Sequence, residues 1–173
     1  AWVLHEKFGL GRGFDHYDDV DTQGTINAQR DGKTVTDAAL GWLQAADDAP
    51  FFAWVHYYDP HTPYNHHPEL AETIPDPYDA EIAFMDIQIG RLLTWLDDTG
   101  KADNTLVVLV ADHGEDLDDH GEEGHGVFLY DTTQQVPMVV RGPAPIVPGT
   151  VVGTTVGLVD VAPTIHELSL IHI

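Results

Sequence analysis

The sequence contains no cysteine, few basic residues and no hydrophobic run of transmembrane length. The absence of cysteine excludes disulfide bonds. Only 7 Lys and Arg residues stand against 29 Asp and Glu, which gives a formal net charge of −22. Such a charge opposes binding to nucleic-acid backbones and to anionic membrane surfaces, so we expect neither as a partner. No apolar run is long enough for a transmembrane helix, so no membrane span is expected in this segment.

What remains is typical of a folded chain. The 173 residues suffice for one domain with a hydrophobic core, and 43% of them are hydrophobic. The first residue is not methionine. We therefore expect the chain to be a piece of a longer protein.

Strand-like apolar runs alternate with helix-like apolar spacing along the chain. A strand, a helix and a second strand on this spacing imply a parallel crossover, so we predict an α/β fold with a mainly parallel sheet sandwiched by helices. The expected helices begin at a capping box at Thr34–Asp37, at Asp76-Pro77 and at Asp160, and the expected strands are residues 51–58, 105–110 and 138–141.

Acidic and imidazole side chains follow the first two of these strands. His61 lies in the loop after the first strand, and Asp112 and His113 follow the second, which is expected to be buried on both faces. Because ligands bind beyond the carboxyl ends of parallel strands, we predict that the two loops open on one pocket. A carboxylate beside an imidazole suits a cation, and Gly114 is expected to let the backbone turn tightly.

Other residues of these loops carry weaker signals. His120 lies among acidic residues, which favours a solvated loop, whereas His125 is flanked by glycines that let its backbone approach a ligand. Asp59 is expected to hold its loop through hydrogen bonds to the backbone rather than to bind a ligand. Tyr64 is the aromatic candidate for contact with a substrate, while Trp54 is expected in the core.

Six segments occur in an order and spacing that is far more specific than any one of them. Together they cover nearly the whole chain. They are FGLGRGFDHYDD (8–19), APFFAWVHYYDPHTPY (49–64), YDAEIAFMDIQIGRLL (78–93), NTLVVLVADHGEDLDDHGEEGHG (104–126), VPMVVRGP (136–143) and GLVDVAPTI (157–165). In these segments the chain resembles the sulfatase family of the alkaline phosphatase superfamily.

The resemblance implies an alkaline-phosphatase-like fold and a metal-dependent sulfuric ester hydrolase. Asp112 and His113 match residues that help sulfatases bind a divalent cation, commonly calcium. An imidazole is not a favoured calcium ligand, so zinc and manganese stay open. His61 matches a histidine that contacts the sulfate group, and His125 stands where many sulfatases have lysine. His125 would neutralise sulfate charge or assist the leaving oxygen, in a pH-dependent way.

One element of the family pattern is missing. Sulfatases use a formylglycine made from Cys or Ser in a Cys/Ser-x-Pro-x-Arg motif, whereas this chain has no Cys and its single serine, Ser169, has no such motif around it. We therefore expect residues 1–173 to be a partial catalytic domain with the formylglycine outside it. The tail, residues 168–173, departs from the family pattern and is expected to be truncated or foreign. The isolated chain is expected to be inactive.

Two alternatives stay open. One is a phosphatase, phosphodiesterase or phosphonate hydrolase of the same superfamily, in which both His113 and His125 bind metal. The other is a degenerate domain that keeps the sheet without the chemistry. The expected substrate of the leading reading is a small-molecule or carbohydrate sulfate ester, and both an exported and a cytoplasmic location fit the sequence.

Overall fold

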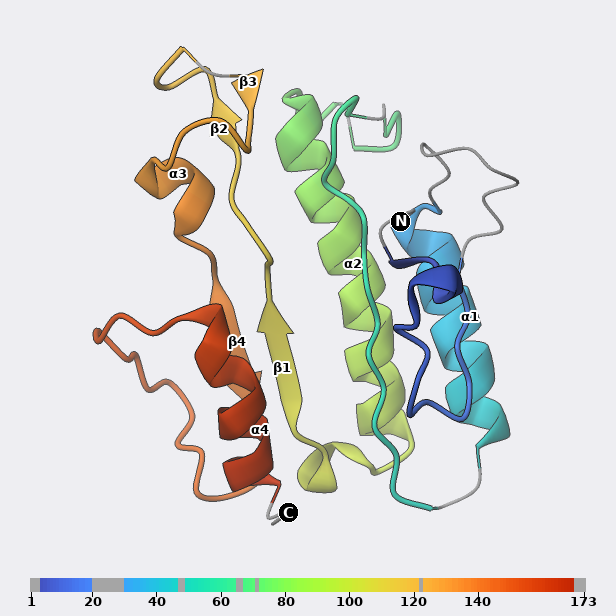
Figure 1. The fold of residues 1–173 in the computed structure, drawn as a ribbon. Helices are drawn as coiled ribbons and strands as arrows, with labels where there is room; N and C mark the ends of the chain where they lie inside the picture. Colours follow the sequence, from blue (N-terminus) through green and yellow to red (C-terminus); the bar gives the residue numbers. More distant parts are fainter. Residues whose placement is uncertain are drawn as a thin grey trace. The chain divides into compact units, whose positions relative to one another are not determined.

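The computed structural model describes residues 4–19, 30–46, 49–64, 67–70, 72–121 and 123–169. The chain divides into two compact units, residues 1–95 and 96–173, which are described one at a time. In chain order the elements are η2 (Glu6–Phe8), α1 (Gly32–Ala45), α2 (Pro77–Asp98), η3 (Ala102–Asn104), β1 (Val107–Val110), β2 (Asp116–Leu117), β3 (Glu123–Gly124), α3 (Asp131–Gln134), β4 (Met138–Arg141), η4 (Leu158–Asp160) and α4 (Val161–Leu168) (Figure 1).

Helix α1 begins at a side-chain cap that the sequence pattern did not single out. Asp31 has extended backbone, and its Oδ1 accepts a hydrogen bond of 2.7 Å from the backbone N–H of Thr34. The predicted cap at Thr34 was therefore wrong, because Thr34 supplies the amide that Asp31 satisfies. The helix itself is confirmed.

Helix α2 begins and ends as predicted. Asp76 Oδ1 accepts hydrogen bonds from the backbone N–H groups of Tyr78 (2.9 Å) and Asp79 (3.2 Å), and Pro77 takes the first helical position. Beyond the helix, Gly100 has a φ of 69°. This left-handed conformation ends the helix at little cost because glycine has no Cβ.

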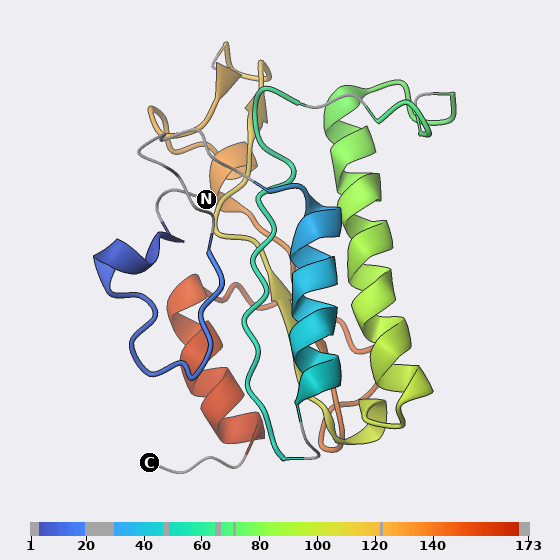
Figure 2. The same cartoon turned by 90° about the vertical axis from the view of Figure 1, so that its right-hand side faces the viewer.

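In unit 1, the extended segment of residues 51–58 runs beside α1 and α2 (Figures 1 and 2). Its Tyr57 hydroxyl is 2.7 Å from Oγ1 of Thr36, a fully buried residue of α1. The described hydrophobic interior of this unit is small and is accompanied by buried polar side chains, namely Leu43 and Ala80 with Thr36, Glu81 and Gln88. Hydrogen bonds inside the unit therefore matter for its stability.

Residues 51–58 are not a strand, which corrects the sequence prediction. The strand pairs of the described residues are β1 with β4 and β2 with β3, both antiparallel, and residues 51–58 take part in neither. A ladder needs a neighbouring backbone, which a sequence pattern cannot supply. Without one, Phe52 and Trp54 remain 65% and 53% exposed, and the expectation that Trp54 lies in the core was wrong.

In unit 2, β1 and β4 form an antiparallel ladder that runs from Val107 opposite Arg141 to Val110 opposite Met138. Both strands were predicted, although β1 begins two residues later than expected. Val110 is 38% exposed and the other β1 residues are partly exposed, so β1 is not buried on both faces as predicted. The carboxyl end of β1 leads directly into the loop that carries most of the predicted site.

The end of unit 2 agrees with the predicted final helix. Helix α4 follows η4 at Asp160 and carries Pro163 in its first turn, where a missing N–H costs nothing. Residues 170–173 of the predicted aberrant tail lie outside the described residues. Within the described part of the chain, no helix combines the length and hydropathy that crossing a membrane requires.

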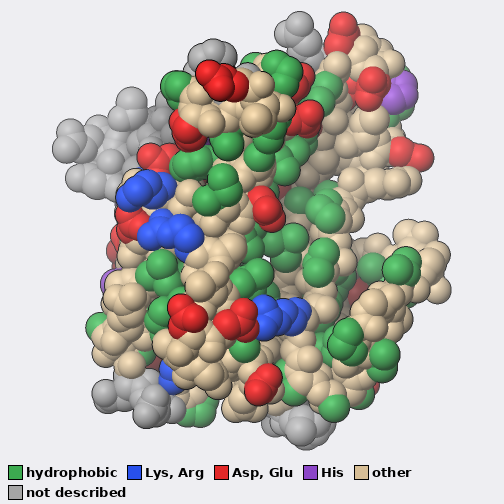
Figure 3. All heavy atoms as spheres, turned by 180° about the vertical axis from the view of Figure 1, so that it is seen from behind, with side chains coloured by type: hydrophobic (Ala, Val, Ile, Leu, Met, Phe, Trp, Pro, Cys, Tyr) green, Lys and Arg blue, Asp and Glu red, His purple; other side chains and the backbone are tan. Residues whose placement is uncertain are grey.

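Acidic side chains are dispersed over the face shown in Figure 3, and basic ones lie next to them. Several of the few basic residues are committed to ion pairs of 2.6–2.9 Å, which are Arg30–Asp18, Lys33–Asp37, Arg91–Asp37 and Arg141–Asp97. The Lys33 and Arg91 pairs lower the pKa of Asp37.

We expect Tyr57→Phe to destabilise the chain by about 1–2 kcal/mol, because the buried Thr36 hydroxyl loses its partner. The measurement is urea unfolding followed by circular dichroism. The double variant Tyr57→Phe/Thr36→Val removes both hydroxyl groups, so its free energy of unfolding should be close to that of the original chain. If the double variant is instead destabilised by the sum of the two single-variant effects, this account is contradicted.

Candidate functional site

The loop between β1 and α3 carries three of the predicted site residues. It folds into the β2–β3 hairpin, in which Asp116 pairs with Gly124. This pairing returns the chain towards its start and brings together the rings of His113 and His125, whose centroids are 3.9 Å apart at an interplanar angle of 31°. Asp112 precedes His113 at the start of the loop.

Asp112 and His113 present a carboxylate and an imidazole at the end of β1. Their side chains are 76% and 42% exposed, and Asp112 Oδ2 is 3.8 Å from His113 Nε2. His113 Nδ1 donates to the carbonyl oxygen of Gly114 at 2.8 Å. In the neutral ring, this bond leaves the lone pair on Nε2, the nitrogen that would bind a metal.

These two side chains fit a metal ion as part of a donor set. The carboxylate suits a hard cation and the imidazole suits a transition metal. Among the described residues, however, no group of three or more His, Asp or Glu side chains is arranged to hold a metal ion. The loop therefore supplies two donors rather than a complete metal site.

His125 is held by a buried carboxylate. Its Nδ1 donates to Glu115 Oε1 at 2.9 Å, and the Glu115 side chain is 7% exposed. The flanking Gly124 and Gly126 have φ values of 99° and 101°, which side chains with a Cβ rarely allow. The two glycines thus permit the turns that place His125 against Glu115.

Gly114 is needed for space rather than for the conformational freedom that we predicted. It is not among the described glycines with positive φ. A Cβ at this position would lie 2.1 Å from the carbonyl oxygen of Thr132, and the Gly114 N–H donates to the carbonyl oxygen of Thr133 at 2.8 Å. The loop therefore packs directly on the backbone of α3.

Sequence reasoning missed Asp116, which is fully buried in this loop. Its Oδ2 accepts hydrogen bonds from His120 Nδ1 at 2.8 Å and from Thr132 Oγ1 at 3.3 Å. Burial raises the pKa of Asp116, but hydrogen bonds led by the His120 side chain outweigh it and leave the pKa below the ordinary value. No local signal distinguishes Asp116 from its acidic neighbours Asp118 and Asp119.

His120 is an exposed loop residue, as predicted, but its ring is also held in place. Besides its bond to Asp116, its ring stacks on Tyr130 with centroids 3.9 Å apart and an interplanar angle of 10°. The side chain is 40% exposed. His120 is thus fixed from two sides.

In unit 1, the backbone N–H of His61 donates to Glu81 Oε2 at 3.0 Å. His61 Nδ1 donates to the carbonyl oxygen of Thr62 at 2.6 Å, so in the neutral ring Nε2 accepts from the Tyr58 hydroxyl at 2.9 Å. Tyr64 packs edge-on against Tyr78, with ring centroids 5.4 Å apart. That His61 and Tyr64 meet the loop of unit 2 stays a prediction.

Asp59 precedes the His61 loop and lies beside a second carboxylate. Burial and the negative charge of Glu81 raise the pKa of Asp59, partly offset by hydrogen bonds from the backbone N–H groups of Asp59 and Gly32. These backbone bonds agree with the predicted loop-holding role. Its Oδ2 is buried and has no hydrogen-bond partner among the described residues.

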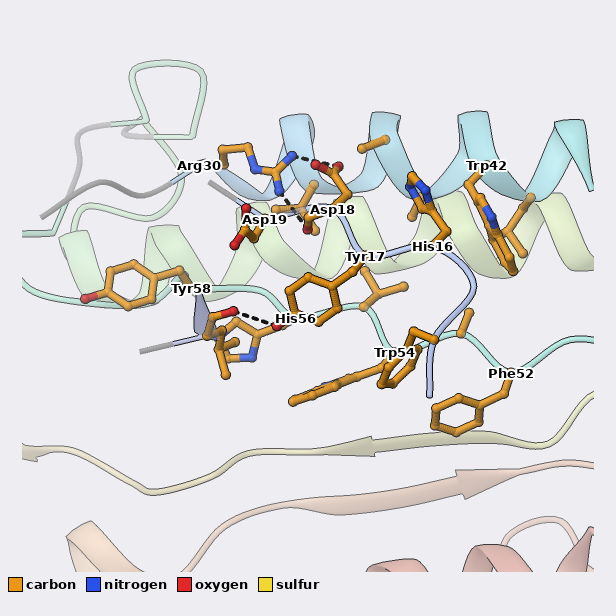
Figure 4. A pocket seen from close by; sticks show the side chains of 18 residues that line it. His16, Tyr17, Asp18, Asp19, Arg30, Trp42, Phe52, Trp54, His56 and Tyr58 are labelled. Carbon is orange, nitrogen blue, oxygen red and sulfur yellow. Dashed lines mark hydrogen bonds and ion pairs between the residues drawn. The ribbon is translucent and has the colours of Figure 1, made fainter. Parts of the chain in front are cut away.

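Unit 1 also contains a pocket of about 170 Å³ between the 4–19 loop, α1 and the 51–58 segment. Figure 4 shows Arg30 and Asp18, which form an ion pair, on the α1 side and Trp54 on the opposite side. None of the predicted site residues lines it. Tyr58, whose hydroxyl bonds to His61, does line it, so the pocket extends to a residue that holds the predicted sulfate contact.

Asp59→Asn is expected to stabilise the chain at pH 7 by an amount on the order of 1 kcal/mol, because it removes a charge from a half-buried site. Because the pKa of Asp59 is raised in the folded chain, the ionised carboxylate destabilises the fold at a pH above that pKa. This destabilisation disappears as the pH falls towards the ordinary pKa of an aspartate. The gain should therefore shrink on acidification. Urea unfolding from pH 8 down to about pH 4, near the ordinary Asp pKa, measures it, with exposed Asp86→Asn as the control. A loss of stability at pH 7 would refute the argument.

Gly114→Ala is expected to destabilise unit 2 by at least about 1–3 kcal/mol, since the added methyl group overlaps the Thr132 carbonyl. Gly153→Ala is the matched control, because nothing lies within 4 Å of a Cβ there. Urea unfolding and amide hydrogen exchange of residues 112–116 would measure both variants. Equal stability of the two would show that the loop does not pack on α3 as described.

Comparisons with known proteins identify the family of the chain. The sulfatase family model matches residues 4–170. Steryl-sulfatase of Rattus norvegicus is 31% identical over 141 residues, which cover 74% of this chain and 24% of that protein. N-acetylglucosamine-6-O-sulfatase of Bacteroides thetaiotaomicron is 33% identical over 96 residues, covering 56% and 17%. The chain thus spans about a quarter or less of these relatives.

The fold is similar to that of a solved structure. The crystal structure of Ps i-CgsB in complex with k-i-k-neocarrahexaose matches with a TM-score of 0.71 at 22% identity, over 82% of this chain and 34% of that one. This likeness confirms the predicted incomplete α/β fold of the alkaline-phosphatase-like kind. Since the family model covers nearly the whole chain, the chain belongs to the sulfatase family.

Proposed function

We propose that this chain is part of a metal-dependent sulfuric ester hydrolase. The observation that carries the proposal is the loop after β1, which gathers Asp112, His113 and His125 and supports His125 on the buried Glu115. Membership of the sulfatase family supports the same reaction class. Because the relatives are named for a steryl and an N-acetylglucosamine sulfate, we extend the proposal to small-molecule and carbohydrate sulfate esters.

Asp112 and His113 are the proposed metal ligands, through a carboxylate oxygen and Nε2. Calcium is the ion expected from the family, while zinc and manganese suit the imidazole better. A divalent cation bound there would supply positive charge close to the sulfate oxygens. The remaining ligands would come from outside the described residues.

His125 and His61 are proposed to contact the sulfate group. Glu115 accepts from Nδ1 of His125 and so fixes which ring edge faces outward. From Nε2, His125 would hold a sulfate oxygen or donate a proton to the leaving oxygen. Glu81 fixes the backbone of His61 and Tyr58 fixes its ring, while Tyr64 is proposed to contact the organic part of the ester.

The nucleophile is not supplied by this chain. It has no cysteine, and its single serine donates from Oγ to the carbonyl oxygen of Ile165 at 2.6 Å at the end of α4. Ser169 therefore does not fit the precursor of a formylglycine, and we assign no step to it. On this basis the isolated chain is proposed to be inactive.

One observation favours a phosphoryl-transfer enzyme as the second candidate. The ring centroids of His113 and His125 lie 3.9 Å apart, so both imidazoles could bind the metal at this site. In that reaction His125 would be a ligand rather than a contact to the ester. A degenerate, non-catalytic domain would instead show no specific metal binding at Asp112.

The decisive experiment compares 4-nitrophenyl sulfate with 4-nitrophenyl phosphate as substrates of the complete natural protein that contains residues 1–173. We expect a higher kcat/KM for the sulfate. His61→Ala and His125→Ala should each lower it by roughly 10²–10³-fold, because each removes a charge-stabilising contact. His166→Ala, at an exposed position of α4, is the control. A preference for the phosphate would assign the chain to the second candidate.

A metal-binding measurement on the 173-residue chain tests the ligands separately. Titration calorimetry with Ca²⁺, Mn²⁺ and Zn²⁺ should show roughly tenfold or greater weakening in Asp112→Asn for the ion that binds tightest. Asp86→Asn, exposed on α2, should bind as the original chain does. Unchanged binding in Asp112→Asn would favour the degenerate domain.

A further inference from the structure

The tip of the β2–β3 hairpin is tied to a buried charge. Asp116 lies at the first position of β2 and is fully buried, yet its carboxylate is charged at neutral pH because its hydrogen bonds lower its pKa. Its Oδ1 accepts from the backbone N–H of His120 at 3.4 Å and its Oδ2 from the His120 ring at 2.8 Å. A buried charge held in this way is expensive to disturb, because removing one partner leaves it unpaired.

The ring of His120 uses one edge for this contact. Asp116 occupies Nδ1, and the face of the ring stacks on Tyr130. The Nε2 atom of His120 has no hydrogen-bond partner among the described residues. His120 therefore has two chemically distinct possible roles. It can bind Asp116 through Nδ1, or it can contact the substrate through Nε2.

The hairpin register links Asp116 to His125. Asp116 pairs with Gly124, the residue immediately before His125, and Glu115, the residue immediately before Asp116, binds the His125 ring. A displacement of Asp116 would therefore move both the strand that carries His125 and the carboxylate that orients it. Thr132 adds a second anchor, because its hydroxyl ties Asp116 to α3.

We propose that His120 is a positioning residue for His125, which it serves through the Nδ1–Asp116 hydrogen bond that fixes the β2–β3 hairpin. The proposal rests on the proposed function, in which His125 contacts the ester. Nothing in the family comparison or the local sequence pattern assigns this role to His120. On this proposal, the position of His125 depends on the Nδ1 atom of His120 and not on its Nε2 atom.

Two side chains separate these edges. Asparagine places an N–H donor close to the position of Nδ1, whereas glutamine places one close to the position of Nε2. His120→Asn should therefore preserve the bond to Asp116, and His120→Gln and His120→Ala should lose it. Asp116→Asn should also lose this bond. Its NH2 group is a hydrogen-bond donor, whereas the Oδ2 that it replaces accepts hydrogen bonds from His120 and Thr132. Asp118→Asn is the matched control at the hairpin tip, because asparagine tolerates the φ of 73° found there.

The first readout does not require activity. In the 173-residue chain, amide hydrogen exchange of residues 116–124 should remain slow in His120→Asn and Asp118→Asn. It should become at least roughly tenfold faster in His120→Ala, His120→Gln and Asp116→Asn, the change expected for the loss of one bond to a charged group. Equal exchange in His120→Asn and His120→Ala would overturn the proposal.

The second readout uses the complete enzyme and 4-nitrophenyl sulfate. Variants that lose the Nδ1 bond should lower kcat by roughly 10–100-fold with a smaller change in KM, whereas His120→Asn should stay within about threefold of the original. Activity retained by His120→Gln and lost by His120→Asn would show direct chemistry at Nε2 and overturn the positioning role. If the complete protein hydrolyses no sulfate ester, the proposed function fails, and the exchange measurement still decides the role of His120 in the hairpin.

Discussion

The candidate site depends on one close contact, between the loop after β1 and the backbone of α3. The Gly114 N–H donates to the carbonyl oxygen of Thr133, and the space beside the Thr132 carbonyl excludes even a methyl group. The same short helix holds Asp116 through the Thr132 hydroxyl. One anchor therefore fixes both parts of the loop, since His113 precedes Gly114 and the hairpin that carries His125 follows Asp116. Within this unit, the segment with Asp112 and His113 and the hairpin with His125 are thus anchored on the same helix.

Buried carboxylates orient the loops of both units. Glu115 holds the ring of His125, Asp116 holds the ring of His120, and Glu81 holds the backbone of His61. Burying each of these carboxylates costs free energy of desolvation. A hydrogen bond from the residue that the carboxylate positions offsets this cost. Asp59 is different, because its Oδ2 is buried without a partner in the described part of the chain and its pKa rises. The acidic residues of this chain thus have two roles. Many lie on the surface, and a few buried ones hold histidines in place.

Local signals in the sequence were sufficient where local chemistry decides the structure. Asp76-Pro77 and Gly100 bound α2 because caps and glycine act on adjacent residues, and β4 follows its proline as predicted. Asp112 and His113 were predicted as site residues because they end an apolar run. The strand expected at residues 51–58 failed because a ladder requires a partner. Asp116 and the packing of Gly114 could not be predicted either, since both depend on α3, which lies far along the chain and has no distinctive sequence.

The acidity of the loop also bears on the ester that it would accept. A sulfate monoester carries one negative charge at neutral pH, whereas a phosphate monoester carries close to two. Asp112, Glu115, Asp116, Asp118 and Asp119 all lie in the loop that presents His125, and the chain as a whole has a net charge of −22. Like charges repel in proportion to their product, so this environment penalises the phosphate dianion about twice as strongly as the sulfate monoanion. The acidic surroundings of the proposed site are therefore consistent with the proposed sulfate ester.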